Sequence, residues 1–337
     1  MRKLASIQRI AEVKAIKDAD LIEAYRVNDW WVVDSKGKYQ VDDKVVYCEV
    51  DSWVPTEIAP FLSKGKEPRE YNGVKGERLR TVRLRGQLSQ GLLLPLNVLD
   101  HVESELIEGL DVSYPLNIQK WEPVLPACLA GQARSTFPSE VPKTDQERIQ
   151  NLKDFNQLLN QHTWEVTEKL HGSSSTFYLD VDSDFHVCSR NLDLKFDEHN
   201  AYWKAALMYD VEQKMRAHNL EGYAIQGELI GEGINGNQYK TTLDFYVFDV
   251  FDVYLAKYLK AEQRVKLCHD LGLKHVPCLH EQYVAKMGDT KDTLLAYAEG
   301  KSMLNGSERE GLVFKSTQNP DVSFKVVSNR WLLKTGE

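Results

Sequence analysis

Residues 164–172 read WEVTEKLHG, a β-forming run that ends at Lys169 and enters a turn before Gly172. A second strand-forming run follows at 175–181, so Lys169 is expected where a strand meets a turn. The pattern K-x-x-G carries little information alone, because a chain of this length contains roughly one match by chance. On this stretch alone, the commoner interpretation is a surface lysine before a tight turn.

Five further elements change this interpretation. In chain order they are CSRN at 188–191, QGEL at 226–229, FYVFD at 245–249, EGLVFK at 310–315 and SFK at 323–325. With K-x-x-G they follow the ordered signature of the covalent nucleotidyltransferases, the superfamily of polynucleotide ligases and mRNA capping enzymes, which the chain therefore resembles. One motif is expected by chance, whereas six in this order are not.

The residue types suit nucleotidyl transfer on physical grounds as well. A lysine amine attacks phosphorus only when it is neutral, and its ordinary pKa is about 10.4. Nearby cations and burial lower that pKa, which gives Lys315 and Lys325 a role beside that of gripping phosphate oxygens. Mg²⁺ prefers carboxylate, phosphate and water oxygens, which suits Glu228 and Glu310. Phe248 provides a flat apolar surface for adenine.

Two departures from the superfamily pattern indicate which branch of the superfamily the chain resembles. DNA ligases and capping enzymes usually have Asp at the third motif position, where this chain has His171, as in RNA ligases that resemble the phage nick-sealing enzyme. Those families carry an OB barrel after the core, whereas here 12 residues follow Lys325 (337 − 325) and the strand-rich segment precedes the core. That order resembles the ATP-dependent RNA ligases of the Deinococcus and Naegleria type, which have an N-terminal OB-like domain.

The resemblance implies a role for each matching residue, with Lys169 as the nucleophile that carries AMP. The expected catalytic residues are Lys169, His171, Arg190, Asp249, Lys315 and Lys325. The expected ATP-binding residues are Glu168, Lys169, Arg190, Glu228, Phe248, Lys315 and Lys325, and the expected ligands of Mg²⁺ or Mn²⁺ are Glu228 and Glu310. The phage-type pattern has a second lysine two residues after Lys325, where this chain has Val327. Either Lys315 and Lys325 suffice, or another cation fills the gap.

The same resemblance implies the reaction. The chain is expected to join RNA 3′-hydroxyl and 5′-phosphate ends through lysyl-AMP and an adenylylated RNA 5′ end, and to seal nicks in duplexes. One alternative is a GTP-dependent capping guanylyltransferase, which His171 and the position of the barrel disfavour. The other is a catalytically inert nucleic-acid-binding protein, which the intact series from Lys169 to Lys325 disfavours.

The sequence predicts an α+β fold in two domains. Residues 1–120 contain short strand-forming runs separated by turns, which favours an OB-like β-barrel, and the Pro-rich residues 121–143 are expected to be a linker. Residues 144–337 alternate strands and helices, and the resemblance implies an adenylyltransferase domain of antiparallel sheets with helices. Thr144 and Glu147 have capping-box spacing, which predicts a helix running towards Leu159, and a further helix is expected at 200–217.

A basic strip in the first domain is a candidate RNA contact. It consists of Arg78, Arg80, Arg83 and Arg85. Alternating positions on a strand share a face, but the step from 80 to 83 breaks this period, so a bulge or turn is expected between them. Contact with an RNA backbone and a solvated, ion-paired strand are equally good interpretations of the strip. Tryptophans 30, 31 and 53 are expected in the core rather than stacked on bases.

The composition limits location and partners. The net charge of −8 argues against a protein that coats nucleic acid, so RNA must be bound by local basic clusters. The five cysteines lack C-x-x-C spacing and the N-terminus lacks a signal-peptide core, which favours the cytoplasm or nucleus without excluding an organelle. Cysteines and histidines at 268–280 lack the paired spacing of a zinc site. A monomer without membrane association is expected.

Overall fold

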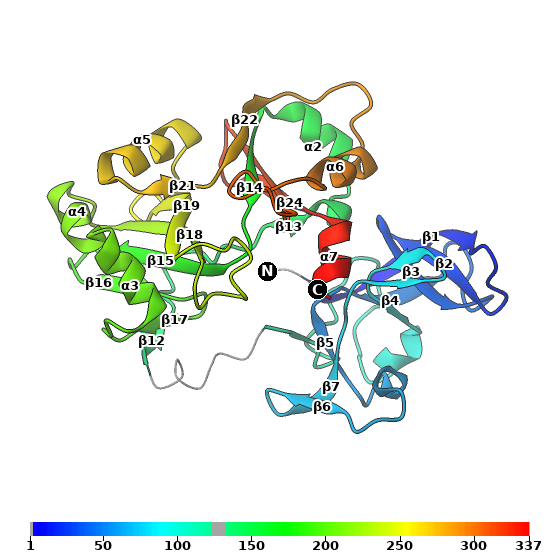
Figure 1. Ribbon diagram of the computed structural model, residues 1–337. Coiled ribbons are helices and arrows are strands. Elements are labelled where there is room, and N and C mark those ends of the chain that lie inside the picture. Colours follow the sequence, from blue (N-terminus) through cyan, green and yellow to red (C-terminus); the bar gives the residue numbers. More distant parts are fainter. Residues whose placement is uncertain (1–2, 123–131, 337) are drawn as a thin grey trace. The chain divides into compact units, whose positions relative to one another are not determined.

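The computed structural model of the protein describes residues 3–122 and 132–336 (Figure 1). The chain divides into two units, Met1–Val124 with Leu332–Glu337 and Leu125–Trp331. The linker predicted at 121–143 lies partly outside the described residues. Across the two described ranges, no helix is long and apolar enough to cross a membrane.

The first unit is built from short strands, as predicted. They are β1 (Ala5–Ala15), β2 (Ile22–Val27), β3 (Trp30–Ser35), β4 (Lys44–Cys48), β5 (Ser52–Pro55), β6 (Arg69–Tyr71), β7 (Val74–Arg78), β8 (Val82–Leu84), β9 (Gln87–Ser89), β10 (Leu92–Leu94) and β11 (Gln119–Lys120). They form a five-stranded sheet in the order β10-β4-β1-β2-β3, a four-stranded sheet in the order β11-β5-β7-β6, and the hairpin β8-β9. Two 3₁₀-helices, Pro60–Ser63 and Leu96–Leu99, complete the unit.

The long strand β1 curves between two neighbours. Its first half pairs with β4 and its second half with β2, and the register shifts by one residue between Ile10 and Glu12. Such a bulge bends a strand. The bend lets β1 pair with β4 over its first half and with β2 over its second half. Sequence analysis did not single out β1, because Arg9, Glu12 and Lys14 interrupt its apolar pattern.

The core of the first unit lies on both faces of β4. Val45 and Tyr47 pack with Tyr25 and Trp30 in one apolar cluster, whereas the alternate residues of β4 pack in another. A strand buried on both faces reads as a continuous apolar run, which explains the sequence VVYC at 45–48. Trp30 is fully buried and Trp53 is 2% exposed, so these two tryptophans are core residues, as predicted.

The second unit contains two main sheets. Its strands are β12 (Ala133–Thr136), β13 (Glu147–Arg148), β14 (Trp164–Lys169), β15 (Ser173–Leu179), β16 (Phe185–Cys188), β17 (Leu192–Leu194), β18 (Tyr223–Ile230), β19 (Asp244–Asp252), β20 (Lys257–Tyr258), β21 (Lys274–His275), β22 (Cys278–Tyr283), β23 (Gly311–Ser316) and β24 (Ser323–Val327). The larger sheet has the order β12-β17-β16-β15-β18-β19-β20, with β21 beside β19, and the smaller has the order β13-β24-β23-β14-β22. Most pairs are antiparallel, which confirms the predicted fold class.

Residues 132–336 contain six helices, the last of which runs from the second unit into the C-terminal residues of the first. They are α2 (Phe155–Gln161), α3 (Ala201–Met208), α4 (Val211–Ala217), α5 (Ala261–Leu271), α6 (Lys291–Ala298) and α7 (Asn329–Thr335), with a 3₁₀-helix at Ile149–Asn151. Helices α3 and α4 lie against the larger sheet (Figure 1), and α2 and α6 share an apolar cluster with the smaller one. The helix predicted at 200–217 is two helices, because Asp210 adopts a left-handed conformation with φ of 49°.

The prediction of a helix that begins after Thr144 was wrong. Glu147 and Arg148 form β13, which pairs in parallel with β24, and the helix begins only at Phe155. The Glu147 carboxylate accepts hydrogen bonds from the Arg148 amide (2.9 Å) and Asn151 (2.8 Å), rather than reaching back to Thr144. The Thr144 hydroxyl lies 3.2 Å from the hydroxyl of Ser174. Pairing with a distant strand therefore overrides the local capping pattern.

Candidate active site

Lys169 and Glu310 meet at the end of β14. The register of β14 and β23 places Lys169 opposite Gly311, so the preceding residue, Glu310, lies beside the lysine. Lys169 Nζ donates a hydrogen bond to Glu310 Oε1 at 2.6 Å. The Lys169 side chain is 26% exposed and that of Glu310 is 8% exposed, so the acid is buried while the lysine stays partly accessible to solvent.

Two glycines of the motifs permit this close packing. A Cβ atom at Gly172 would lie 2.2 Å from the carbonyl oxygen of Leu229, and one at Gly311 would lie 2.3 Å from the carbonyl oxygen of Val326. Contacts this short require glycine, because the obstructing atoms belong to the backbone. The K-x-x-G and E-G patterns thus have a structural cause: both glycines let neighbouring strands approach the lysine.

His171 lies beside the same pair. Its Nδ1 is 3.7 Å from Glu310 Oε2, and its ring centroid is 5.1 Å from that of Trp331. Its backbone amide donates a hydrogen bond to the hydroxyl of Tyr239 at 2.8 Å. Tyr239 and Trp331 are buried and shape the site, yet sequence analysis missed both. No motif marks them, since they lie on a loop and a helix whose positions depend on the assembled fold.

The two acidic residues expected to bind metal differ in protonation. Burial raises the pKa of Glu310, but the Lys169 ammonium and His171 outweigh this effect and lower it to about 2. Burial raises the pKa of Glu228 to about 7, and the nearby Lys169 opposes the increase only in part. One carboxylate is therefore firmly ionised, while the other titrates near neutral pH.

A divalent ion fits these two carboxylates together with phosphate oxygens. Glu310 Oε2 is buried and accepts no hydrogen bond from the described residues. Hard cations such as Mg²⁺ and Mn²⁺ favour one or two carboxylates plus phosphate and water. No group of three or more His, Cys, Asp or Glu among residues 3–122 and 132–336 is arranged to hold a metal by itself. Of the cysteines and histidines at 268–280, Cys268 is buried and the His269 side chain is 90% exposed.

Glu168 and Phe248 border the apolar side of the site. Glu168 is 1% exposed, and its Oε2 accepts a hydrogen bond from the Met303 amide at 2.8 Å. Burial raises the pKa of Glu168. Phe248 is partly buried against an apolar cluster that contains Leu170 and Tyr239. Phe248 therefore shares an apolar cluster with Leu170, the residue that follows Lys169.

Lys315 is buried in contact with a carboxylate. Its Nζ donates a hydrogen bond to Asp249 Oδ1 and lies 3.4 Å from the carbonyl oxygen of Phe248. Lys315 is opposite Glu165 in the register of β14 and β23, four residues along the strand from Gly311. Burial lowers the pKa of Lys315, and Asp249 opposes this shift.

Arg190 and Lys325 share one carboxylate. Asp145 Oδ1 is 3.1 Å from Lys325 Nζ, and Asp145 Oδ2 is 3.3 Å from Arg190 Nη2. Arg190 lies in the turn between β16 and β17 of the larger sheet, and Lys325 lies on β24 of the smaller sheet, so Asp145 links cations from both parts. Sequence analysis did not identify Asp145, which precedes β13 and belongs to no motif. Val327 is buried on β24 opposite Gly311.

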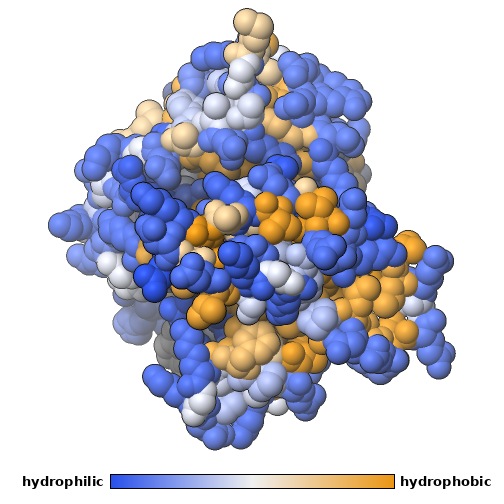
Figure 2. Space-filling view, turned by 90° about the vertical axis from the view of Figure 1, so that its right-hand side faces the viewer, coloured by the Kyte–Doolittle hydropathy of each residue, from blue (hydrophilic) through white to orange (hydrophobic). Residues whose placement is uncertain are grey.

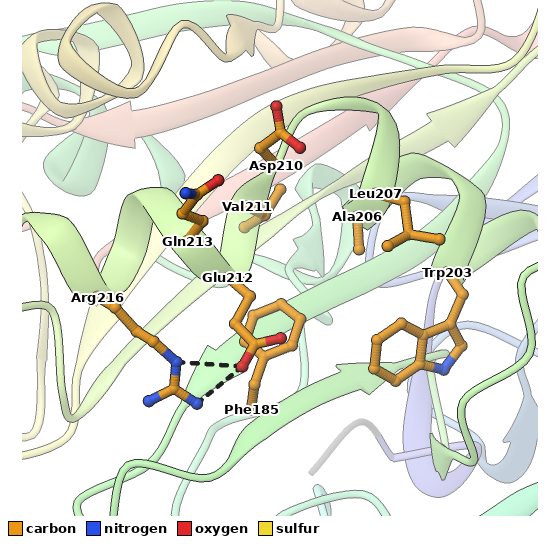
Figure 3. A pocket seen from close by; sticks show the side chains of 9 residues that line it. All are labelled: Phe185, Trp203, Ala206, Leu207, Asp210, Val211, Glu212, Gln213 and Arg216. Atoms are coloured by element: carbon orange, nitrogen blue, oxygen red, sulfur yellow. Dashed lines mark hydrogen bonds and ion pairs between the residues drawn. The ribbon is translucent and has the colours of Figure 1, made fainter.

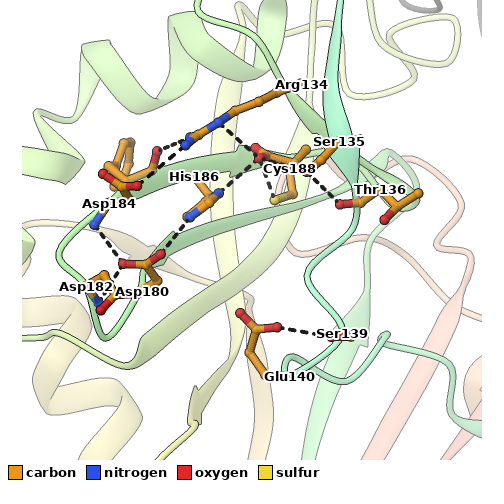
Figure 4. Close-up of polar contacts among 12 residues, drawn as sticks. Arg134, Ser135, Thr136, Ser139, Glu140, Asp180, Asp182, Asp184, His186 and Cys188 are labelled. Carbon is orange, nitrogen blue, oxygen red and sulfur yellow. Dashed lines mark hydrogen bonds and ion pairs between the residues drawn. The ribbon is translucent and has the colours of Figure 1, made fainter.

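His186 lies on β16, shortly before the turn that carries Arg190, and its ring lies beside Asp180 (Figure 4). Its Nδ1 lies 3.0 Å from Asp193 Oδ2 and its Nε2 lies 3.2 Å from Asp180 Oδ2. Asp193 lies on β17, immediately after the turn, and also lies 3.8 Å from Arg134 Nε. The hydrogen bond to Asp193 raises the pKa of His186, although burial opposes it.

A pocket lies on the helical face of the larger sheet (Figure 3). Its lining is Phe185, Trp203, Ala206, Leu207, Asp210, Val211, Glu212, Gln213 and Arg216. Glu212 and Arg216 bond to each other across one turn of α4 at 2.8 Å. No motif residue lines this pocket, which is formed where α3 and α4 pack on β16.

The four arginines of the predicted basic strip fall into two groups. Arg78 is paired with Asp51 at 2.7 Å and lies 3.8 Å above the ring of Trp121, which is a structural role. Arg80, Arg83 and Arg85 are exposed. The predicted break between 80 and 83 is confirmed, because β7 ends at Arg78 and β8 begins at Val82.

The hairpin of β8 and β9 combines basic and apolar side chains. Arg85 and Gly86 form its turn with φ of 47° and 82°. Val82 and Leu84 are 42% and 41% exposed beside the arginines. Figure 2 shows a face of the molecule on which hydrophilic residues predominate and apolar residues gather in a few places.

Comparisons with known proteins agree with this geometry. Residues 162–327 match the RNA ligase family model, and residues 4–96 match a family of OB-fold domains. No curated protein matches the chain. The second unit thus matches a ligase core, and the first confirms the predicted OB-like barrel.

Solved structures of Naegleria gruberi RNA ligase are similar over nearly the full length. A ligand-free variant has a TM-score of 0.90 and 40% identity, covering 98% of this chain and 97% of that chain. A variant with ATP and manganese has a TM-score of 0.89 and 40% identity, covering 98% of each chain. A variant with AMP and manganese gives the same TM-score, identity and coverage. With this identity over both units, the chain belongs to the RNA ligase family.

Proposed function

We propose that this protein is an ATP-dependent RNA ligase that carries AMP covalently on Lys169. The observation that carries the proposal is the position of Lys169 Nζ, 2.6 Å from Glu310 Oε1 at a sheltered strand end. Membership of the RNA ligase family supports it. The related Naegleria gruberi enzyme has been solved with ATP or AMP and manganese, which supports the same nucleotide here.

The first step is attack on the α-phosphorus of ATP by the neutral amine of Lys169. A nitrogen–phosphorus bond forms, the bond to the β-phosphate oxygen breaks, and pyrophosphate leaves while the amine proton passes to water. Glu310 holds Nζ in place through its hydrogen bond. Glu168 contacts the adenine and Phe248 stacks on it, as the burial of both side chains against the site allows.

The phosphate oxygens are held by cations. Lys315 and Lys325 bind the α-phosphate, with Arg190 and His171 orienting the remaining oxygens, while Asp249 supports Lys315. Mg²⁺ or Mn²⁺ held by Glu228 and Glu310 would neutralise charge that develops on the phosphates. Positioning and charge neutralisation account for most catalysis of this kind.

The second and third steps act on RNA. The RNA 5′-phosphate attacks the phosphorus of lysyl-AMP, and Lys169 leaves as an amine. The 3′-hydroxyl then attacks the 5′-phosphate, a phosphodiester forms, and AMP departs. We infer a nicked duplex with an RNA 3′-hydroxyl strand as the substrate, contacted by Arg80, Arg83 and Arg85 of the first unit. The protein acts as a monomer. The four cysteines within the described ranges are free thiols, which favours an intracellular location.

An intact-mass measurement tests the proposal directly. The purified protein incubated with ATP and Mg²⁺ is expected to gain the mass of one adenylyl group on Lys169, located by peptide mapping. Parallel incubations with labelled ATP and labelled GTP separate a ligase from a capping enzyme. Label retained from GTP alone would contradict the proposal. Sealing is then compared on a nicked duplex and on single-stranded RNA, and preference for the single strand would exclude nick sealing.

A further inference from the structure

Arg264 lies at the centre of a buried charge network outside all of the motifs. It lies on α5 and is 1% exposed. Its Nη2 donates a hydrogen bond to Glu165 on β14, and its Nε donates to His275 Nε2 on β21 at 3.0 Å. Arg264 therefore connects a strand of the smaller sheet with a strand of the larger one.

His275 is held as a neutral acceptor. Its Nδ1 lies 2.7 Å from the Val276 carbonyl oxygen, so this nitrogen carries the proton and leaves Nε2 free to accept from Arg264. Burial lowers the pKa of His275 to about 4. Two of the three guanidinium nitrogens are thus fixed, and the planar group cannot rotate without breaking both bonds.

The third nitrogen points towards Asp249. Arg264 Nη1 has no hydrogen-bond partner among the described residues and lies 3.9 Å from Asp249 Oδ1. The same oxygen accepts the hydrogen bond of Lys315 Nζ. One carboxylate oxygen is therefore approached by two cations, of which only one is bonded to it.

This arrangement matters when Lys315 binds a phosphate. Asp249 is 2% exposed, and loss of its lysine partner would leave a buried carboxylate without that hydrogen bond, which is strongly unfavourable. A shift of the Asp249 side chain by about 1 Å would bring its carboxylate to hydrogen-bond distance of the fixed Arg264 Nη1. The replacement contact would also satisfy the unbonded guanidinium nitrogen.

We propose that Arg264 is a positioning residue that takes over the Asp249 carboxylate as Lys315 turns to the ATP phosphates. The inference rests on the proposed phosphate contact of Lys315. Arg264 touches neither nucleotide nor metal; it lowers the free energy needed to release Lys315. Hydrogen bonds to Glu165 and His275 hold the guanidinium with its third nitrogen near Asp249. A buried arginine suits this position because its three nitrogens can meet three different partners.

ATP binding to a set of variants tests the proposal. The set is Arg264→Met, Arg264→Lys, Asp249→Asn and the double variant Arg264→Met with Asp249→Asn. Calorimetric titration with ATP and Mg²⁺ reports affinity without requiring turnover. Arg264→Met is expected to weaken ATP binding about tenfold, and Arg264→Lys less, since it keeps a positive charge near Asp249. In the Asp249→Asn background the side chain at position 249 carries no charge for Arg264 to balance, so Arg264→Met should change ATP affinity less than about twofold.

Leu271→Ala is the matched control. It removes a buried apolar side chain from the same helix without touching the network. If it weakens ATP binding as much as Arg264→Met at equal loss of melting temperature, Arg264 acts only through packing and the proposal fails. The proposal also fails if Arg264→Met weakens ATP binding equally in the wild-type protein and in the Asp249→Asn variant. If Arg264→Met does not fold, Arg264→Lys is combined with Asp249→Asn in the same cycle.

The wild-type protein separates this inference from the proposed function. Wild-type protein that forms lysyl-AMP supports the ligase whatever the Arg264 variants do. Wild-type protein that binds no ATP removes the basis of both proposals.

Discussion

Lys169 Nζ donates a 2.6 Å hydrogen bond to Glu310 Oε1, although 141 positions separate the two residues in the chain. The antiparallel pairing of β14 with β23 produces this contact, because it places Lys169 opposite Gly311. A carboxylate delivered by the neighbouring strand holds the amine where a nucleotide phosphate can reach it. The pairing of these strands is thus part of the chemistry as well as of the fold.

Replacement of Lys169 by Ala should abolish lysyl-AMP. The rate of sealing of 5′-phosphate RNA is expected to fall by about a thousandfold or more, because the variant lacks the amine that is proposed to accept AMP. An RNA that already carries AMP on its 5′ end bypasses the lysine and should still be sealed. Gel-based sealing assays with both substrates measure this difference. Wild-type rates on 5′-phosphate RNA would show that the nucleophile is a different residue.

Replacement of Asp145 by Asn should strengthen the binding of anions. Asp145 pairs with both Arg190 and Lys325, which are proposed to bind phosphate, and its carboxylate competes with that phosphate. The pairs are partly exposed, so the gain is expected to be no more than about fivefold in affinity. Calorimetric titration with pyrophosphate measures it. Weaker binding would mean that Asp145 orients the two cations instead of competing for them.

Replacement of His186 by Gln should cost more stability at acidic than at basic pH. Asp193 and Asp180 raise the pKa of His186 in the folded protein, while Arg134 opposes them. Stabilisation by a group of this kind is complete below the unfolded pKa of about 6.5 and is lost as pH rises through the folded value. We expect the variant to lose about 1 kcal/mol more at pH 5.5 than at pH 9. Thermal melting at both pH values measures the difference.

The control for His186 is an exposed histidine. The side chain of His199 is 82% exposed, so His199→Gln should change stability equally at the two pH values. A loss for His186→Gln that is the same at pH 5.5 and pH 9 would show that the imidazole is neutral between its two carboxylates.

Replacement of Arg83 and Arg85 by Ala should weaken RNA binding in a salt-dependent way. Each lost phosphate contact reduces the slope of log affinity against log salt by about 0.7 to 0.9. Two contacts predict a reduction of about 1.4 to 1.8, measured by fluorescence anisotropy at several salt concentrations. Lysyl-AMP formation needs no RNA and checks that the second unit is intact. Replacement of the exposed Lys36 and Lys66 of the same unit is the control; an equal change of slope would show that the hairpin has no special role.

The sequence alone indicated the two-domain α+β fold and the family. Strands β14 and β15 were predicted because their residue types favour extended structure and a turn with Gly172 separates them. The glycines at 172 and 311 were recognised only as motif letters, and the structure shows that neighbouring backbone atoms exclude any side chain there.

Several site residues could not have been found in this way. Asp145, Tyr239, Arg264 and Trp331 belong to no motif, and each contacts residues that are distant in the chain. The helix predicted from Thr144 failed for the same reason, since pairing of β13 with β24 outweighs a local capping pattern.

The amino-acid sequence by itself determined which chemistry the chain carries, because residue type and order along the chain define a nucleophile, two acids and several cations. Only the tertiary structure decided which acid meets which cation. Ion pairing and burial depend on distances between strands that are far apart in the chain, and local sequence patterns do not contain these distances.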